Sequence, residues 1–162
     1  MKFQTKRFLL KKITQRNATE EYLSWLKYFG GDGQKIIQQT QNSKKSLRQY
    51  IKLKNQNTNV IFLAIYLKSN YRHIGNIKFE PIDLINKQTT LGVLIGDPKW
   101  RSKKVFPEIL SCLESYLKNK IRLKKIILGV GKKNSHAIYV YKKNGFKVIR
   151  ENNNSYIMMK KI

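Results

Sequence analysis

One stretch of the chain that begins at Asn134 combines a helix signal with an ionisable side chain. Asn134 follows an apolar run, and its side chain can accept a hydrogen bond from a free backbone N–H of a helix that starts there. Ala137 and Tyr141 are four residues apart, so they share one face of that helix. Gly145 follows at the end of the predicted helix, where a residue with a left-handed backbone conformation commonly terminates the helix. The spacing predicts a strand, a helix and a strand in succession, with the Tyr141 phenol as a group that can hold or release a proton.

The order of residues in this stretch resembles the coenzyme A end of the GNAT N-acetyltransferases. The shared pattern is Asn-x-x-Ala-x-x-x-Tyr-x-Lys-x-Gly-Phe, and it ends here at Phe146. The resemblance implies that Tyr141 donates a proton to the departing thiolate and that Asn134 contacts the pantetheine arm. A phenol has a reference pKa of about 10 and a thiol one of about 8.5, so this donation depends on positioning rather than on strong acidity. The alternative is an ordinary strand-helix-strand element in which Tyr141 packs in the core.

A second piece is the end of a predicted strand, from Gly92 to Asp97. The resemblance implies that this strand bulges and splays from its neighbour, so that its free backbone groups can bind the pantetheine arm. A backbone N–H there can also polarise the thioester carbonyl, which is the usual large contribution in acyl transfer. The residues with this implied role are Leu94, Ile95 and Gly96. Taken alone, the same run is equally consistent with a buried strand.

A third piece is the loop that begins at Arg101, in the place of the family's pyrophosphate loop. A predicted helix follows the loop, and the free N–H groups of a helix N-terminus suit phosphate. The family has small residues where this chain has Lys104 and Phe106, and glycine lets a backbone approach phosphate and adopt a positive φ. We therefore expect weaker coenzyme A binding, with the Lys104 charge in place of backbone access. The residues with an implied phosphate-binding role are Arg101, Ser102, Lys103, Lys104, Val105 and Phe106.

The general base, which must take a proton from an ammonium substrate, has no motif of its own. Acidic residues are few, and the nearest candidates along the predicted sheet edge are Glu80, Asp83 and Asp97. Glu80 ends a predicted strand and is our first choice, although the same position would suit a solvated strand end. His73, in a predicted turn, ranks below it.

The chain of 162 residues carries 34 Lys and Arg against 9 Asp and Glu, a formal net charge of +25. Such a charge favours a polyanionic partner. The basic residues are spread along the whole chain instead of being gathered in one tail or helix, which favours a compositional bias as the cause. A nucleic-acid binder rests on charge alone and is not expected. The charge should still speed the arrival of anionic ligands in a salt-dependent way.

The remaining composition narrows the class of protein. Cys112 is the only cysteine, and His73 and His136 are far apart in sequence, so neither an internal disulfide nor a metal site is expected. The sequence has no run of about 18 apolar residues, and its N-terminus lacks the features of a signal peptide. We therefore expect a cytoplasmic protein without a membrane span.

The elements that must position these pieces follow from the hydrophobic pattern. Strands are expected at residues 3–13, 60–67, 74–79, 88–95, 125–130, 146–150 and 156–161. Helices are expected from Thr19 to the glycine-rich residues 30–33, and at 46–53, 105–120 and 135–144. This order predicts an α/β protein with a mixed, mostly antiparallel central sheet flanked by about four helices. The resemblance implies a single-domain GNAT fold over residues 1–162.

These observations together predict an acetyl-CoA-dependent N-acetyltransferase that transfers the acetyl group directly to a primary amine. The segments Arg7 to Ile13 and Tyr22 to Leu26 resemble a branch that includes enzymes of ribosomal-protein and small-amine acetylation. The same branch includes enzymes that act on nucleotide-linked amino sugars of surface glycans. The charge favours the sugar, because a basic enzyme repels basic proteins and polyamines but attracts a diphosphate.

Two alternatives to the sugar reading stay open at this point. One is an acetyltransferase for ribosomal proteins or polyamines. The other is a non-catalytic GNAT-fold binding module, because the pyrophosphate loop lacks its glycines. The expected partner is a small-molecule amine, and a homodimer is left open.

Overall fold

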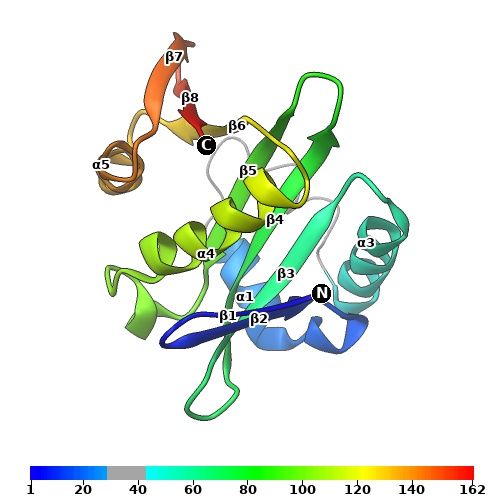
Figure 1. The fold of residues 1–162 in the computed structure, drawn as a ribbon. Helices are drawn as coiled ribbons and strands as arrows, with labels where there is room; N and C mark the ends of the chain where they lie inside the picture. The colour runs from blue at the N-terminus through cyan, green and yellow to red at the C-terminus, as the bar shows by residue number, and fades with distance from the viewer. Residues whose placement is uncertain (29–42) are drawn as a thin grey trace.

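The structure is a computed structural model that describes residues 1–28 and 43–162. The described strands join in one mixed sheet of order β1-β2-β3-β4-β5-β6-β8-β7 (Figure 1). The strands are β1 (Lys2–Gln4), β2 (Phe8–Lys12), β3 (Ile61–Leu67), β4 (His73–Asp83), β5 (Gln88–Ile95), β6 (Lys125–Gly131), β7 (Lys147–Glu151) and β8 (Ser155–Lys161). The helices are α1 (Glu20–Tyr28), α3 (Lys44–Gln56), α4 (Val105–Asn119) and α5 (Ser135–Lys143), with the short 3-10 turns η1 (Gln15–Asn17) and η2 (Pro98–Trp100).

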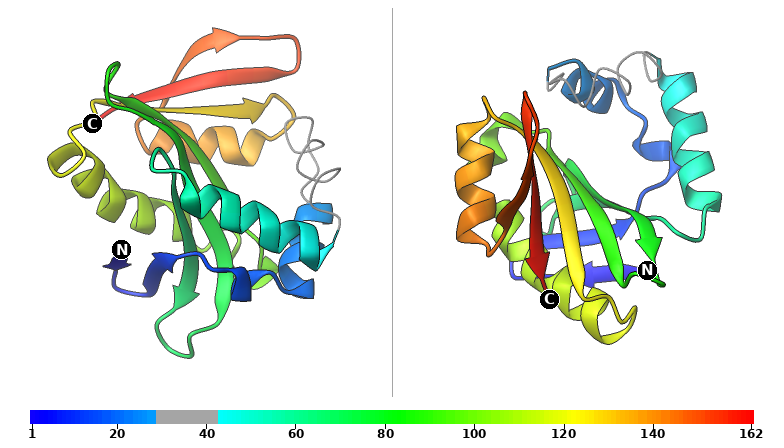
Figure 2. Two further views of the ribbon diagram at one scale, coloured as in Figure 1. Left: turned by 90° about the vertical axis from the view of Figure 1, so that its right-hand side faces the viewer. Right: turned by 90° about the horizontal axis from the view of Figure 1, so that it is seen from above.

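The helices cover the two faces of the sheet in pairs, with α1 and α3 on one face and α4 and α5 on the other (Figure 2). Side chains alternate between these faces along each strand, because successive Cβ atoms of a strand point in opposite directions. In β3, Leu63 and Ile65 pack in the α4 cluster, whereas Phe62 and Ala64 pack in the α1 and α3 cluster. The predicted α/β class, a mixed and mostly antiparallel sheet with four helices in the described residues, is confirmed.

Local sequence explains where several helices begin. At the start of α3, the Ser43 hydroxyl accepts a hydrogen bond from the Ser46 N–H at 3.1 Å. At the start of α5, Asn134 Oδ1 accepts one from the Ala137 N–H at 3.1 Å, which confirms the predicted helix start. These side chains satisfy backbone donors that a helix leaves free in its first turn.

The sheet opens between its two parallel neighbours, β5 and β6. Their pairing is limited to Gln88 with Lys125, Thr89 with Ile126, and Thr90 with Ile127. The remainder of β5 stays paired with β4 on its other side, and β6 stays paired with β8. Beyond Thr90, the edge of β5 that faces β6 therefore has no strand partner among the described residues. The structure thus contains the splay that the sequence led us to expect.

The structure corrects two of the expected elements. The chain does not form one strand over residues 3–13, because Thr5 reverses it between β1 and β2. The Thr5 hydroxyl accepts a hydrogen bond from the Phe8 N–H at 3.0 Å, and the Thr5 N–H donates to the Phe8 carbonyl at 2.9 Å. β4 begins earlier than predicted, so His73 lies in a strand and not in a turn. The helix stop predicted at residues 30–33 lies outside the described residues.

Candidate active site

The end of β5 has fewer free backbone groups than the sequence suggested. The Gly96 N–H donates to the Ile74 carbonyl at 2.9 Å, and the Gly96 carbonyl accepts from Arg101 Nη2 at 3.0 Å. Both backbone groups of Gly96 are therefore used within the protein. Leu94 is paired with Asn76, and its carbonyl faces β4, so the structure corrects its predicted role. This leaves Ile95 as the residue of the predicted segment whose backbone groups face the open edge of β5.

Two glycines let other parts of the chain approach this strand end closely. A Cβ on Gly75 would lie 2.3 Å from the Leu94 carbonyl oxygen, so glycine allows the close approach of β4 to β5 there. A Cβ on Gly96 would lie 1.9 Å from the Trp25 indole ring. The indole of α1 therefore rests directly on the backbone at the end of β5, and it brings α1 next to the open edge.

The loop before α4 takes a left-handed backbone conformation without glycine. Ser102 has a φ of 59°, and Lys104 has a φ of 55° and a ψ of 32°. Such angles are uncommon for residues that carry a Cβ. Lys104 is also the N-cap of α4, and no side chain caps this helix. Pro107 has no N–H, so Val105 and Phe106 supply the N–H groups at the start of the first turn.

Phe106 does not lie where its bulk would obstruct the loop, which corrects the expectation from the sequence. Its side chain is 7% exposed and packs edge-on against the Tyr141 ring, with the ring centroids 5.3 Å apart. The Tyr141 ring also lies 5.9 Å from the ring of Phe146. Phe106 therefore links the start of α4 to α5 through the core, and only its backbone is directed at the loop.

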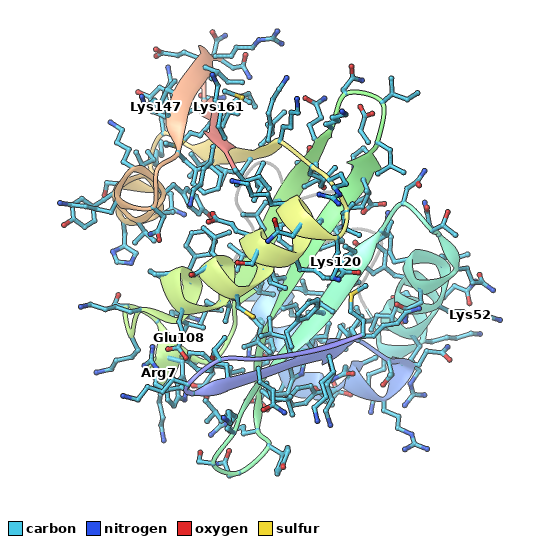
Figure 3. All side chains as sticks on the ribbon, viewed as in Figure 1. Arg7, Lys52, Glu108, Lys120, Lys147 and Lys161 are labelled. Carbon is cyan, nitrogen blue, oxygen red and sulfur yellow. The ribbon has the colours of Figure 1, made fainter. Side chains whose placement is uncertain are left out.

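An ion pair between Arg7 and Glu108 ties the loop to the turn between β1 and β2 (Figure 3). Arg7 Nε lies 2.7 Å from Glu108 Oε2, and Arg7 Nη2 donates to the carbonyls of Lys103 at 2.9 Å and Lys104 at 3.3 Å. The Thr5 hydroxyl donates to Glu108 Oε1 at 2.6 Å. Burial would raise the pKa of Glu108, but the hydrogen bonds from Thr5 and Arg7 outweigh it and lower the pKa.

The side chains of the loop lie at the surface, beside the start of α5. Ser102, Lys103 and Lys104 are exposed, and the Ser102 hydroxyl is 3.4 Å from His136 Nε2 on α5. Asn134 is also exposed, although its side-chain oxygen already caps α5. The starts of α4 and α5 therefore meet in a region that offers cations and helix N–H groups, which suits a phosphorylated ligand.

Tyr141 lies in the layer between α4 and α5, with its ring partly buried. Desolvation raises the pKa of Tyr141 to about 12. Its hydroxyl therefore stays protonated at neutral pH, which a proton donor requires. The alternative, a purely packed aromatic residue, accounts for its contacts equally well, so the role of Tyr141 stays a prediction.

Glu80 is held between two lysines on the opposite face of the sheet. Its carboxylate forms ion pairs with Lys54 of α3 and with Lys78 Nζ, the latter at 2.7 Å. Lys78 also donates to the Tyr50 hydroxyl at 2.7 Å. Partial burial would raise the pKa of Glu80, but the hydrogen bonds from Lys54 and Lys78 outweigh it and lower the pKa. A carboxylate with a lowered pKa is a weaker base, so this geometry disfavours Glu80 as the group that removes a proton.

The other acidic candidates are engaged in local structure. Asp97 is buried, its Oδ1 accepts from the Lys99 N–H at 3.0 Å, and its Oδ2 lies 3.3 Å from Arg72 Nη2. Asp83, in the hairpin between β4 and β5, accepts a hydrogen bond from the Asn86 N–H at 2.9 Å. Asp97 thus caps η2 and Asp83 shapes a turn.

A cavity of about 100 Å³ lies between the sheet and the helices α1 and α3. Leu94 contributes to its lining, so the cavity reaches the open end of β5. Much of the wall is apolar, and none of the described residues that line it is acidic. The polar side chains in the lining are Tyr22, Tyr50, Asn76 and Lys78.

The residues considered for metal or redox chemistry are dispersed. Cys112 is a free thiol on α4, with its Sγ 3.8 Å from the Gln4 carbonyl. Within residues 1–28 and 43–162, no group of three or more His, Cys, Asp or Glu could hold a metal ion. In the same described residues, no helix is both long and apolar enough to cross a membrane.

The fold and the arrangement of the site are those expected of an acyltransferase that uses a coenzyme A thioester. The opening between β5 and β6, the cationic start of α4 and the tyrosine beside it are the parts that the resemblance predicted. The family model described as "Acetyltransferase (GNAT) domain" matches residues 7–147, so the chain belongs to this family. The predicted enzyme class, an N-acetyltransferase, is confirmed, and the GNAT family uses acetyl-CoA.

Solved structures of GNAT enzymes share the fold over nearly the whole chain. One, described as a ribosomal-protein-serine acetyltransferase from Vibrio cholerae, has a TM-score of 0.79 at 14% identity and covers 100% of this chain and 98% of its own. The PaiA N-acetyltransferase of Thermoplasma acidophilum, in complex with coenzyme A, has a TM-score of 0.75 at 22% identity, with 96% and 99% covered. A spermidine N-acetyltransferase SpeG chimera from Vibrio cholerae and hSSAT has a TM-score of 0.76 at 15% identity, with 95% of each chain covered. At these low identities, the structural likeness shows the fold alone, and the predicted GNAT fold is confirmed.

A search of curated proteins found no match for this sequence.

Sequence reasoning missed the cavity and the residues that line it. Asn76, Lys78 and Tyr50 come from two elements that are far apart in sequence, and no motif joins them. One signal was present in β4, where Asn76, Lys78 and Glu80 alternate with apolar residues. This alternation marks a polar strip on one face of a strand whose other face is core.

Proposed function

We propose that this protein is an acetyl-CoA-dependent N-acetyltransferase that transfers the acetyl group directly to a primary amine. The observation that carries the proposal is the open edge of β5 beyond Thr90. Because β5 and β6 are parallel, the segments that follow them emerge at the same edge of the sheet, where ligands of α/β proteins commonly bind. These segments are the loop before α4 and the Asn134 helix start. An extended thioester arm along β5 would contact both.

In this proposal the phosphates of the coenzyme bind at the start of α4. The left-handed backbone at Ser102 and Lys104 turns the chain into the helix, and the side chain of the N-cap residue Lys104 makes no capping hydrogen bond. Anions are stabilised there by the helix N–H groups and by nearby cations. The residues assigned to phosphate are Arg101, Ser102, Lys103, Lys104, Val105 and Phe106, with Asn134 assigned to the pantetheine arm.

The chain's residues have three tasks in the proposed transfer. The backbone N–H of Ile95 stabilises the negative charge that develops on the carbonyl oxygen. The amine nitrogen bonds to the carbonyl carbon, the carbon–sulfur bond breaks, and Tyr141 gives its proton to the sulfur. The amine also loses a proton. Glu80 is the acceptor predicted from the sequence, but its ion pairs with Lys54 and Lys78 make it a weak base, so we propose that this proton passes to solvent water.

We further propose that the acceptor is a neutral or anionic amine, with a nucleotide-linked amino sugar as the first candidate. The cavity presents Lys78 and no acidic side chain among the described residues, so a polyamine would find no counter-charge there. The net charge of +25 acts in the same direction at long range. The alternative acceptors, a ribosomal protein or spermidine, are supported by the names of two structural neighbours.

Several expectations stay predictions: one domain over residues 1–162, a homodimer, a cytoplasmic location, and the non-catalytic alternative. Titration calorimetry with acetyl-CoA at low salt addresses the last of these. One site per chain supports the enzyme, whereas the absence of heat and of a thermal shift at millimolar acetyl-CoA would contradict it. A panel of amines assayed by thiol release at two ionic strengths then ranks the acceptors. Faster turnover of spermidine or a basic peptide than of the amino sugar would reject our choice of acceptor.

A further inference from the structure

The cavity between the sheet and α1 contains a buried amide whose nitrogen has no partner. Asn76 is 3% exposed, and its Nδ2 has no hydrogen-bond partner in the structure. Asn76 also belongs to the cavity lining. A buried donor without a partner is unfavourable unless something else satisfies it. We propose that this something is an oxygen atom of the acceptor, an inference that rests on the proposed function.

His73 fixes the orientation of this amide. His73 Nε2 lies 3.0 Å from the Gly75 carbonyl oxygen and 2.9 Å from Asn76 Oδ1. A carbonyl oxygen only accepts, so Nε2 must carry the hydrogen. The same N–H can meet Asn76 only if the amide presents its oxygen to His73, which turns the nitrogen the other way. Desolvation lowers the pKa of His73, so the ring is neutral at pH 7.

Aromatic rings hold His73 in this position. The centroids of the Trp25, Tyr66 and Tyr22 rings lie 5.1, 5.3 and 5.9 Å from that of the imidazole. Tyr66 is itself held by Asn17, whose Nδ2 donates to its hydroxyl at 2.5 Å. His73 is thus a positioning residue: it acts on the acceptor through Asn76, and the rings keep it from turning away.

The register of the sheet places Asn76 beside the proposed reaction point. Asn76 pairs with Leu94, and Leu94 also lines the cavity. Adjacent strands are about 4.8 Å apart. An acceptor oxygen bound by Asn76 therefore lies close to a thioester carbonyl held at Ile95, the residue next to Leu94 whose backbone faces the open edge, where the amine must attack. This short separation suits an oxygen on the carbon next to the one that bears the amine.

The cavity also limits what surrounds these two groups. It is small, about 100 Å³, and Leu26, Leu47 and Phe62 form part of its wall. The substrate class that fits is a primary amine with a hydroxyl or carbonyl oxygen on the neighbouring carbon and a compact apolar remainder at the same end. An amino sugar with a hydroxyl next to the amine supplies the required oxygen and fits where the remainder at that end is apolar, as in a deoxy position, whereas an unsubstituted alkylamine or polyamine supplies no such oxygen.

The test compares two amines of equal heavy-atom count, 2-aminoethanol and propylamine, which differ by one oxygen. The side-chain amide resonances of Asn76 are recorded by NMR on the full chain without acetyl-CoA, and the spectrum of Asn76→Leu assigns them by their absence. We expect 2-aminoethanol to shift these resonances and propylamine to leave them unchanged. Equal responses to the two amines, or no response to either at saturating concentration, would overturn the proposal.

Kinetics supply the second readout. The wild-type enzyme should prefer 2-aminoethanol by about tenfold in kcat/KM, the scale of one buried hydrogen bond. Asn76→Leu keeps the shape of the side chain and should abolish the preference through KM. A preference that persists in this variant would overturn the proposal. Because the NMR measurement needs no acetyl-CoA, a protein that fails to bind the coenzyme can still show the selective shift, so the two proposals fail separately.

Discussion

The α4 face of the sheet is packed with aliphatic and aromatic side chains, whereas the α1 and α3 face sets an imidazole, an amide and an ammonium group among its rings. Ile109 and Leu113 are typical of the first face. His73, Asn76 and Lys78 represent the second. Burying polar groups is unfavourable unless they are paired. The first face thus explains the stability of the fold, and the second is where the proposed substrate chemistry is concentrated.

The largest expected effect comes from damaging the apolar face. Ile109 is fully buried, so Ile109→Ala should lower the free energy of unfolding by about 2–5 kcal/mol through lost contacts and a cavity. Urea denaturation measures this change. Asn76→Leu is the matched control on the other face, and its effect on unfolding should stay within about 1 kcal/mol because an apolar group of similar shape replaces an unsatisfied donor. A larger loss for Asn76→Leu would reverse the comparison.

The second prediction concerns Tyr141, which lies on the apolar side but would act on the thioester. Tyr141→Phe keeps the ring against Phe106 and removes the proton, so turnover should fall about 10²-fold, equal to about 2.7 kcal/mol, at unchanged coenzyme affinity. Steady-state kinetics and calorimetry check the two halves of this statement. Full activity would remove Tyr141 from the mechanism.

The pH dependence of Tyr141 gives a third test. Desolvation raises its pKa to about 12 in the folded protein, compared with about 10 in an unfolded chain. The protonated form is thus preferred by the fold, and its contribution to stability is complete below pH 10 and is lost as the pH rises toward 12. Turnover should show no loss of the acid between pH 7 and 10 in the wild type. An alkaline limb near pH 8 that disappears in Tyr141→Phe would contradict this assignment.

A smaller effect is expected where the two faces meet at the strand end. Gly96→Ala places a methyl group against the Trp25 ring, which overpacking makes unfavourable by about 1–3 kcal/mol. The indole must move, so acceptor KM should rise more than the dissociation constant of acetyl-CoA. Gly129→Ala is a suitable control, because its added Cβ would make only an ordinary contact, 3.8 Å from the Ile157 side chain, and Gly129 is not part of the cavity lining. An equal effect of both variants would show that Trp25 does not set the acceptor site.

The smallest effect concerns the ion pair between Arg7 and Glu108, which holds the loop before α4. Glu108→Gln removes the charge that holds Arg7, so coenzyme binding should weaken by about 1 kcal/mol without loss of loop cations. The lowered pKa of Glu108 means that its contribution to stability is present above its ordinary pKa and is lost as the pH falls through the lower folded value. Calorimetry at pH 7 measures the binding change. An unchanged dissociation constant would limit this ion pair to a role in folding.

How much of this could be read from the sequence depends on the distance between the residues involved. Asn134 caps α5 through a contact three residues away, and such local signals predicted the helix and the order of the elements along the chain, whereas the class of enzyme came from the resemblance to a family. The packing of Phe106 on Tyr141 brings together residues of two different helices, so its inward orientation was not visible. The backbone is left-handed at Lys104, a conformation for which the sequence pattern of the family favours glycine. Arg7 holds the loop through a hydrogen bond to the distant Lys104 carbonyl, and patterns within a short stretch of sequence cannot predict such a contact.

The acceptor side was hidden from the sequence for the same reason. Asn76 and Tyr50 reach the cavity from β4 and α3, and Leu94 reaches it from β5. Glu80 was chosen because it ends a predicted strand, but β4 continues to Asp83, and the neighbours Lys54 and Lys78 could not be assigned to Glu80 without the fold. Ion pairs between residues of different elements therefore determine which carboxylates remain available as a general base.

The opening between β5 and β6 determines which backbone segments are expected to unfold locally as one unit. Among the described residues, the backbone ladder of β6, β8 and β7 joins the rest of the sheet through the pairs of Gln88, Thr89 and Thr90 with β6 and through the bonds of Lys124 and Lys125 to the Lys87 carbonyl. Segments with few shared backbone hydrogen bonds tend to open as separate cooperative units. We expect amide protons of β6 and β8 to exchange with deuterium as one group, faster than those of β3 and β4. A ligand between β5 and β6 would contact both parts of the sheet at once. It should therefore slow deuterium exchange even at amide groups with which it makes no contact.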